Sequence, residues 1–388
     1  MNNRDYFLHL LASVLHGRAP LAPPLATDWT AIYRCADAHQ LHMFLCEAVS
    51  LLPTADRPPE AILKALSRRS KRELLRDTVQ AASEDELTRA LEQQGIRHVP
   101  FKGRRLKKLY PKPELRMMAD LDVLIDARDA KKVRALMLEL GYQSEEFGRN
   151  HDVYFRQPFM NVEMHRRLVA ARSPFSSALK NYYADAKPQA GSAFRCAFSD
   201  EALFVYLLIH MHKHFISGGT GIRMFLDIWL FHRALDEQFD TAAVNKTLEK
   251  IGLSEFRDMA LRQGDAWFGA DSLRGVFSDD KEIRDFVFGS GTYGTEHHGT
   301  AAKLLENRGG MLRRTLEFCF PPLDRMAVQY PVLGKLPVLL PLCWVARGAR
   351  DVFRFPQRSL RNFRRTTALT PEQIDTVRRV YKKSGLIR

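Results

Sequence analysis

Three acidic residues lie in short apolar runs of the kind that form β-strands. Asp120 and Asp122 stand two residues apart at the start of the run Leu121–Ile125, and Glu163 lies in a later apolar run. Because side chains alternate along a strand, both aspartates should share one face, about 6 to 7 Å apart. Two carboxylates this close repel each other unless a cation lies between them. The pattern therefore predicts a divalent metal site with three carboxylates, as in two-metal phosphoryl-transfer sites.

A basic turn precedes the aspartates. An apolar run of strand length is followed by Lys102, Gly103 and Arg104, and then by a segment with helical spacing. A glycine at the start of a helix can present backbone N–H groups to a phosphate, and the neighbouring cations add positive charge. Arg116, four residues before the first aspartate, is expected to orient the carboxylates or a phosphate. We therefore predict that these four residues bind a nucleotide or phosphate group.

Hydrophobic periodicity divides the chain into four parts. Residues 1–58 have helical spacing broken by a proline-rich stretch and predict a small helical cap. Residues 59–170 predict a compact α/β core, with a long helix up to Gln94, a second helix from Ala130 to Leu140, and strand-length runs at 96–101, 121–125, 153–155 and 162–164. Residues 171–342 predict a large all-helical domain that selects the acceptor, and residues 343–388 form a basic tail.

The order of these motifs resembles the DNA polymerase β-like nucleotidyltransferase superfamily, and more closely the bacterial family of uncharacterised nucleotidyltransferases. The resemblance covers about residues 60–340 and rests on Phe101-Lys-Gly-x-x-Leu106, Arg116-x-x-x-Asp120-x-Asp122, Leu140-Gly-Tyr142 and Val162-Glu-x-His165. It implies an α+β fold, in which a nucleotidyltransferase core with a mixed sheet is flanked by the helical cap and the helical domain. It also implies that Asp120, Asp122 and Glu163 are catalytic and ligate Mg²⁺, with Mn²⁺ as an alternative.

One departure from the superfamily bears on the donor. Many members have Gly-Ser or Gly-Gly where this sequence has Lys102-Gly103-Arg104. The serine that would donate to the β- and γ-phosphates is therefore missing, and Lys102, Arg104 or Arg116 would have to supply that contact. The resemblance implies a nucleoside triphosphate or a nucleotide sugar as donor. It leaves the acceptor open among polysaccharide precursors, peptides or proteins, and RNA.

The resemblance continues more weakly into the helical half, through His210-x-x-x-His214 and Asp227. It favours a position for these residues and for His165 in the cleft that faces the catalytic core, and we predict all four as substrate-cleft residues. Two alternatives are hydrogen bonding within the helical core, and a metal site of the two helical histidines with Asp227.

Other sequence features exclude several classes of protein. The run Gly289-Ser-Gly-Thr-Tyr-Gly294 matches the dinucleotide-binding pattern literally, but it follows a helical pattern, and no P-loop motif is present. An apolar content of 45% and a charged content of 27% over 388 residues are ordinary for a folded globular chain and exclude wholesale disorder. Five scattered cysteines without a CxxC pair predict reduced thiols and a cytoplasmic protein.

The charge of the chain is concentrated near its end. The net charge is +14, and residues 343–388 hold twelve Lys or Arg against three acids, or +9. The most apolar run, Val332–Ala346, is too short and too broken by prolines to span a bilayer. A solvated helix face, RNA binding and contact with an anionic membrane all fit this tail, so the protein is expected to be cytoplasmic or peripheral at the inner membrane.

Together these features predict a Mg²⁺-dependent nucleotidyltransferase that works by a two-metal, three-carboxylate mechanism. The alternatives are a catalytically inactive nucleotide-binding scaffold, which the missing serine favours, and a basic protein that binds RNA or a membrane surface. Three convergent carboxylates argue against both, because a pure binding protein does not need them in a cationic cleft.

Overall fold

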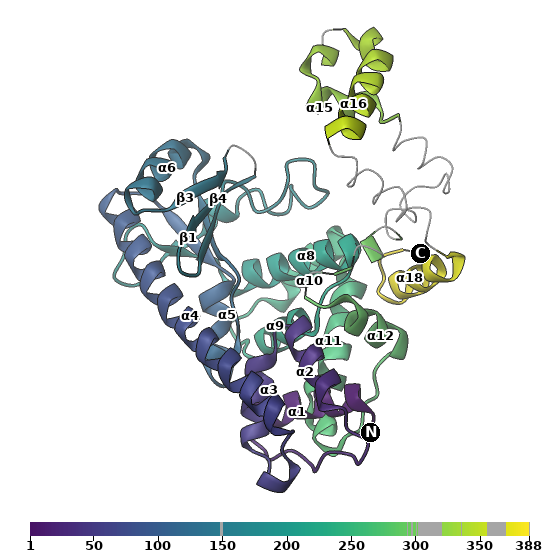
Figure 1. Cartoon of the computed structure of the whole chain (residues 1–388). Helices are drawn as coiled ribbons and strands as arrows, with labels where there is room; N and C mark the ends of the chain where they lie inside the picture. The colour runs from purple at the N-terminus through teal and green to yellow at the C-terminus, as the bar shows by residue number, and fades with distance from the viewer. Residues whose placement is uncertain are drawn as a thin grey trace.

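A computed structural model describes residues 1–147, 150–292, 294–295, 298–299, 301, 320–334, 336–354 and 370–387 (Figure 1). The N-terminal part consists of α1 (Asn3–Leu15), α2 (Trp29–Ala38) and α3 (His42–Ser50). A 34-residue helix, α4 (Glu60–Gln93), then runs along one side of the molecule, its first half beside α3 and its second half beside the sheet (Figure 1). The structure therefore confirms that the N-terminal cap is helical and that a long helix follows it.

A five-stranded mixed sheet follows, and this confirms the predicted α+β fold. Its strands are β1 (His98–Phe101), β2 (Leu121–Ile125), β3 (Gln143–Glu146), β4 (His151–Arg156) and β5 (Met160–His165), in the order β1-β2-β5-β4-β3. The pair β2–β5 is parallel, and the other pairs are antiparallel. The short helix α5 (Gly103–Lys107) lies between β1 and β2, and α6 (Ala130–Glu139) between β2 and β3.

The two faces of the sheet belong to different cores. Leu121, Val123 and Ile125 pack with Val162 and residues of α4 and α6 into a closed core on one face, as expected for the apolar neighbours of the aspartates. The opposite face carries Asp122 and Glu163, and the flanking β1 packs there into the larger core of the helical half. Alternation along the strands thus holds the acidic residues away from the α4–α6 side.

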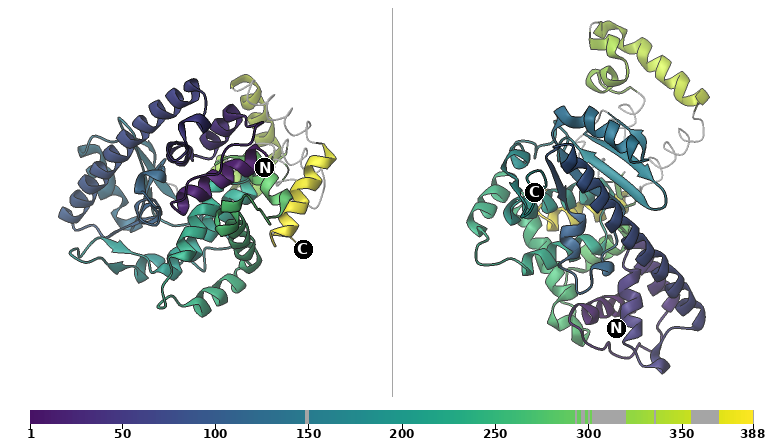
Figure 2. Two further views of the ribbon diagram at one scale, coloured as in Figure 1. Left: turned by 90° about the horizontal axis from the view of Figure 1, so that it is seen from below. Right: turned by 90° about the vertical axis from the view of Figure 1, so that its left-hand side faces the viewer.

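The second half is helical, as predicted. It contains α7 (Tyr182–Asp185), α8 (Asp200–Gly218), α9 (Ile222–Arg233), α10 (Thr241–Lys250), α11 (Ser254–Phe268) and α12 (Lys281–Ser290), with a small two-stranded ladder of β6 (Lys187–Pro188) and β7 (Cys196–Ala197). Figure 2 shows the N-terminal helices lying against this half, and α1 contacts α11 directly. One continuous core joins α1, α3, β1 and α8 to α12, whereas the exact domain boundaries stay a prediction.

The end of the chain has two helical segments. The first comprises α15 (Leu323–Gln329) and α16 (Leu340–Arg354), with a small core of Met326, Leu333 and Cys343, and it stands off the body in Figures 1 and 2. The second is α18 (Pro371–Lys383), which packs on α12. Part of the predicted basic tail, 355–369 and 388, lies outside the described residues. None of the helices described for this chain is long and apolar enough to cross a membrane.

A tight contact between α9 and α11 gives a prediction for stability. A Cβ atom added at Gly264 would lie 2.9–3.1 Å from three atoms of the Trp229 side chain. Overpacking of this kind costs about 1–3 kcal/mol, so Gly264→Ala is expected to lower the free energy of unfolding by about that amount. Gly348→Ala is the matched control, because that glycine also lies in a helix and its added Cβ meets nothing within 4 Å. Equal urea midpoints for the two variants would contradict this account.

Candidate active site

A cavity of about 630 Å³ lies between the acidic face of the sheet and the helices α8 and α9. Its lining includes ten of the predicted site residues: Lys102, Gly103, Arg116, Asp120, Asp122, Glu163, His165, His210, His214 and Asp227. The remaining one, Arg104, does not line the cavity and instead pairs with Asp85 of α4 at 2.6 Å. The structure thus brings the predicted residues of the catalytic core and of the helical half to one place.

Asp122 occupies the centre of the site. In the parallel pair β2–β5 it lies directly opposite Glu163, so the strands themselves hold the two carboxylates side by side. Its Oδ1 accepts hydrogen bonds from Lys102 Nζ and His165 Nε2, both at 2.9 Å, and the residue is almost fully buried. Burial opposes ionisation, but these two partners hold the pKa of Asp122 well below its usual range. The side chain is therefore a carboxylate at neutral pH.

The sequence pattern placed Asp120 in the same strand as Asp122. In the structure Asp120 lies one residue before the start of β2. Burial raises the pKa of Asp120, the negative charges of Asp122 and Glu163 raise it further, and Lys102 opposes them. The three carboxylates therefore interact electrostatically inside one cavity. A set of oxygen ligands that destabilise one another's charge fits a divalent cation of the Mg²⁺ or Mn²⁺ type.

Lys102 supplies the fixed positive charge of the site. Its backbone has φ +60° and ψ −103°, a conformation that a non-glycine residue rarely adopts and that costs roughly 1–3 kcal/mol. The side chain runs between the rings of Phe101 and Tyr206, with Nζ 5.4 and 5.8 Å from the two ring centroids. Although burial by itself would lower it, the pKa of Lys102 is raised by Asp122 and its neighbours, so the amine is charged. The strained backbone of Lys102 thus places its ammonium group beside Asp122.

Gly103 follows Lys102 and begins α5, which is only five residues long. A Cβ atom at this position would lie 2.9 Å from Met118 Sδ, so the turn and the loop before Asp120 approach each other closely here. The predicted role of this turn in phosphate binding stays a prediction.

Arg116 has a partner that its position in the sequence did not suggest. Its Nε and Nη2 donate to the two carboxylate oxygens of Asp227 on α9 at 2.7 and 2.9 Å, and Tyr110 Oη donates to the same Oδ1 at 2.7 Å. Both members of the pair are more than 90% buried. The two residues therefore join the catalytic core to the helical half, and a phosphate contact of Arg116 stays a prediction.

The histidines of α8 contribute neutral rings to the opposite wall of the cavity. Burial lowers the pKa of His210 well below its ordinary value, and it lowers the pKa of His212 and of His214 to about 4. The rings of His210 and His214 are in edge contact, with centroids 4.6 Å apart. Asp227 is held by Arg116 and Tyr110, so the three do not form a metal cluster within the part of the chain that the structure describes.

These neutral histidines make stability depend on pH. A histidine whose pKa is about 4 when folded and about 6.5 when unfolded binds its proton first in the unfolded chain, so stability falls as pH drops from about 6.5 towards 4. His212 packs edge-on against Phe175 and Phe256. As pH drops through that window, the free energy of unfolding should fall less steeply in His212→Phe than in wild type, by roughly 1 kcal/mol per pH unit. Urea titrations at pH 7.0, 6.0 and 5.0 test this, and parallel pH curves for wild type and variant would refute it.

His151 is a site residue that the sequence pattern did not reveal. It begins β4, lies directly opposite His165 on β5, and its Nε2 is 3.8 Å from Glu163 Oε2. His165 Nε2 is 3.3 Å from the same oxygen. Among the described residues, His151, Glu163 and His165 form the group whose ligand atoms all lie within 4.8 Å of one another. The Glu163 carboxylate thus lies close to two imidazole rings.

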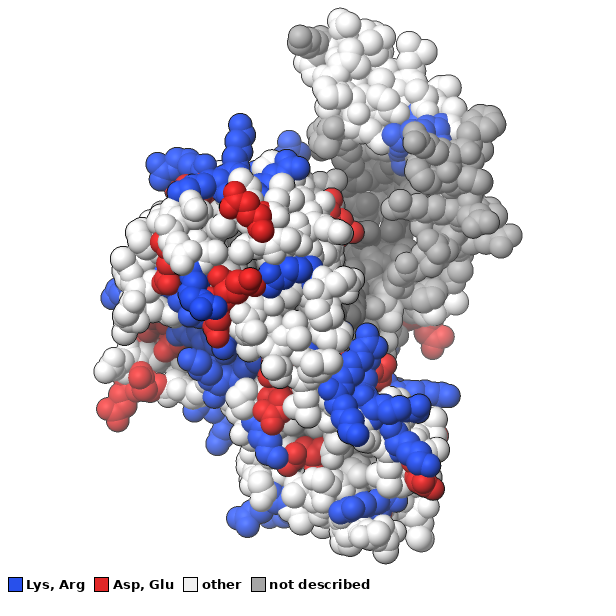
Figure 3. All heavy atoms as spheres, turned by 60° about the vertical axis from the view of Figure 1, so that its left-hand side comes forward, with Lys and Arg blue, Asp and Glu red and all other residues white. Residues whose placement is uncertain are grey.

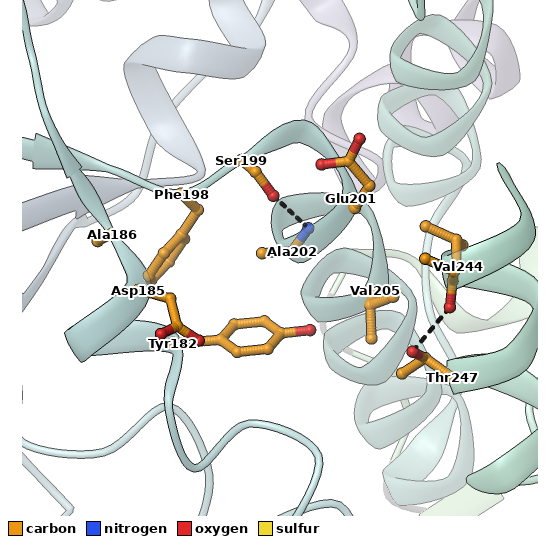
Figure 4. Close-up of a pocket in the computed structure, with 11 residues that line it drawn as sticks. Tyr182, Asp185, Ala186, Phe198, Ser199, Glu201, Ala202, Val205, Val244 and Thr247 are labelled. Carbon is orange, nitrogen blue, oxygen red and sulfur yellow. Dashed lines mark hydrogen bonds between the residues drawn. The ribbon is translucent and has the colours of Figure 1, made fainter. Parts of the chain in front are cut away.

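A second, smaller pocket of about 220 Å³ lies beside the N-terminal end of α8 (Figure 4). Tyr182, Phe198, Val205 and Val244 contribute apolar surface, whereas Asp185 and Glu201 are its acids. The cavity beside Asp122 is therefore the candidate active site, because it combines acids, a buried cation and histidines.

Comparison with protein families gives a match to the model of the uncharacterised nucleotidyltransferases over residues 26–269. This range includes all five strands of the sheet and both walls of the cavity. The chain belongs to this family. Comparisons with curated proteins and with solved structures gave no match. Membership in the family supports nucleotidyl transfer in general, and it makes a nucleotide the expected substrate of this nucleotidyltransferase.

Proposed function

We propose that this nucleotidyltransferase transfers a nucleotidyl group from a nucleoside triphosphate or nucleotide sugar to an acceptor in the cavity, with Mg²⁺ or Mn²⁺ as cofactor. The observation that carries the proposal is the convergence of Asp120, Asp122 and Glu163 beside Lys102 in one cavity. A purely structural site has little reason to gather three carboxylates around a single paired ammonium group.

The carboxylates fit the metal that the family implies. Lys102 and His165 both contact Oδ1 of Asp122, and no hydrogen bond to its Oδ2 occurs within the described residues. That oxygen, Asp120 and Glu163 would hold the divalent cation, which neutralises phosphate charge and polarises the phosphorus when bound. Lys102 adds a second positive charge on the same side, which can compensate in part for the missing serine.

The proposed reaction is an in-line displacement at the α-phosphorus. A bond forms between an acceptor oxygen and phosphorus, the bond from phosphorus to the leaving phosphate oxygen breaks, and the acceptor proton passes to water in the cavity. Lys102 orients the phosphates, and the rings of Tyr206 and His210 supply apolar contact surface on the helical wall. The acceptor stays open among polysaccharide precursors, peptides or proteins, and RNA.

The test is a calorimetric titration of nucleoside triphosphates and nucleotide sugars, with and without Mg²⁺, into wild type and the double variant Asp120→Ala, Asp122→Ala. We expect binding of at least one nucleotide that requires Mg²⁺ and is lost in the double variant. Arg104→Ala is the control, because Arg104 lies outside the cavity lining and should leave binding unchanged.

Two outcomes would contradict the proposal. Binding that needs neither metal nor the aspartates would favour a nucleotide-binding scaffold. Absence of binding to any member of the panel, in a protein that melts cooperatively, would remove the support for a nucleotide substrate.

A second proposal concerns contact with an anionic membrane through the segment 320–354. Its outer surface exposes Leu336, Val338, Leu342 and Val345, which are 52%, 79%, 67% and 71% exposed. Figure 3 shows that this projecting part has a largely uncharged surface, whereas Lys, Arg, Asp and Glu alternate over the body. Exposed apolar side chains next to a chain end with a charge of +9 suit an anionic lipid surface.

Vesicle co-sedimentation tests this second proposal at about 50 mM salt, where charge is weakly screened. Wild type is expected to sediment with phosphatidylserine-containing vesicles, and the double variant Leu342→Asp, Val345→Asp is expected to remain in solution. Absence of sedimentation of the wild type, or equal sedimentation with neutral phosphatidylcholine vesicles, would overturn it.

A further inference from the structure

Two histidines, His151 and His165, lie beside Glu163. A metal site made only of carboxylate oxygens would not require them. Cross-strand pairing sets His151 opposite His165, and Glu163 lies two residues before His165, so the three side chains share one face of the sheet. The His151 and His165 ring centroids are 5.0 Å apart. Sites built on strands in this way are held more rigidly than sites on loops.

The distances fit one ion between the three side chains. Ligand atoms at 2.0–2.2 Å from a tetrahedral metal lie roughly 3.3–3.6 Å from one another. Glu163 Oε2 is 3.3 Å from His165 Nε2 and 3.8 Å from His151 Nε2, and the ligand atoms of all three side chains lie within 4.8 Å of one another, so the side chains would have to draw closer around a bound ion. A group of two imidazoles and one carboxylate suits a borderline transition metal better than Mg²⁺, which prefers oxygen ligands.

Access and charge also agree with an ion at this position. The side chains of His151 and Glu163 are 33% and 24% exposed, whereas His165 is nearly buried, so the group is closed on the protein side and open towards the cavity. His165 Nε2 reaches both Asp122 and Glu163, at 2.9 and 3.3 Å, although one ring nitrogen carries only one hydrogen. An ion between the carboxylates would take the place of this hydrogen, because His165 must release it from Nε2 before that nitrogen can bind a metal.

We propose that His151, Glu163 and His165 bind a borderline divalent transition metal, such as Zn²⁺ or Cu²⁺, with an open coordination position that faces the cavity. This inference rests on the proposed function for the role of the ion, because it adds imidazole ligands from His151 and His165 to the metal site that includes Glu163. Binding of the ion itself is measurable without turnover.

The test is a calorimetric titration of Zn²⁺ into the full chain after removal of metals by chelation. Wild type is expected to bind one ion tightly at this site, and His151→Ala is expected to weaken that binding at least about 10-fold. His151 is partly exposed, so its loss should be tolerated by the fold; Glu163→Gln, which keeps the shape of the side chain, should weaken binding as well. His214→Ala is the matched control from the opposite wall of the same cavity, and it should leave Zn²⁺ affinity unchanged.

Pulsed EPR of bound Cu²⁺, an ion that imidazole ligands suit, gives a direct readout of the ligands. Wild type should show nitrogen coupling from coordinated imidazole, and this coupling should weaken in His151→Ala. Equal Zn²⁺ affinity in wild type and His151→Ala, loss of affinity in His214→Ala instead, or Cu²⁺ bound without nitrogen coupling would each overturn the inference. The nucleotide titration distinguishes the two proposals, because Asp120→Ala, Asp122→Ala should abolish Mg²⁺-dependent nucleotide binding whether or not the histidine site exists.

Discussion

Asp122→Asn is expected to reduce nucleotidyl transfer at least about 100-fold, because the variant removes the central carboxylate of the proposed metal site. It should also destabilise the fold. Lys102 Nζ lies 2.9 Å from Asp122 and is buried, and an ammonium group left without its counter-ion costs about 3–5 kcal/mol. Activity at saturating nucleotide and urea unfolding measure the two effects.

A double variant separates the chemical effect from the structural one. Lys102→Met, Asp122→Asn removes both charges, so most of the lost unfolding free energy should return while activity stays low. Recovery of activity together with stability would show that Asp122 acts only as the partner of Lys102. Full activity of Asp122→Asn alone would refute the metal-site assignment.

Breaking the Arg116–Asp227 pair is expected to have an equally large effect on stability. Asp227→Ala leaves a buried guanidinium group without its two charged hydrogen bonds and also removes the acceptor of Tyr110, which should cost about 3–5 kcal/mol. Replacement of the pair by Arg116→Met, Asp227→Leu should recover much of this loss, because apolar residues of similar volume leave no buried charge.

The matched control is an exposed pair with similar geometry. The Arg128 side chain donates three hydrogen bonds to the Asp126 carboxylate, but it is 89% exposed. Solvent screening makes such pairs weak, so Arg128→Ala should leave the urea midpoint unchanged. Equal effects of Arg128→Ala and Asp227→Ala would contradict the role that we assign to burial.

Much of the fold could be predicted from the sequence, because periodicity is a local property. The runs that became β1, β2 and β5 are apolar and short, and the helices from α8 to α12 follow the 3.6-residue spacing of their buried side chains. Strand β3 was not predicted, because its sequence Gln-Ser-Glu-Glu has no apolar alternation and lies at the edge of the sheet. Edge strands carry little sequence signal of their own.

The candidate site could be predicted by residue type, whereas its pairings could not. Arg116 and Asp227 are 111 positions apart, and no local pattern links them. Asp122 and Glu163 were predicted to converge, but the cationic partners of Asp122 depend on the strained backbone of Lys102. The roles of the individual acids stay predictions, because they depend on a bound metal and nucleotide.

His151 could have been found from turn geometry. Strands β4 and β5 form a hairpin in which Arg156 pairs with Met160, and regular antiparallel pairing from that turn places His151 opposite His165. A turn at Gln157–Phe159 is indicated by the proline between them. Recognition of that turn would have predicted the cross-strand histidine pair without a structure.

The parallel pairing of β2 with β5 has a consequence for the order in which the protein is made. Asp122 leaves the ribosome well before Glu163, and α6, β3 and β4 must be synthesised between them before the two strands can pair. Asp227, which holds Arg116, emerges later still. During synthesis the nascent chain therefore passes through lengths at which Asp122 has Lys102 but not His165 or Glu163. At these lengths Arg116 is also present without Asp227. Because domains fold from the N-terminus as they emerge, closure of the cavity is a late event in the biogenesis of this enzyme family member.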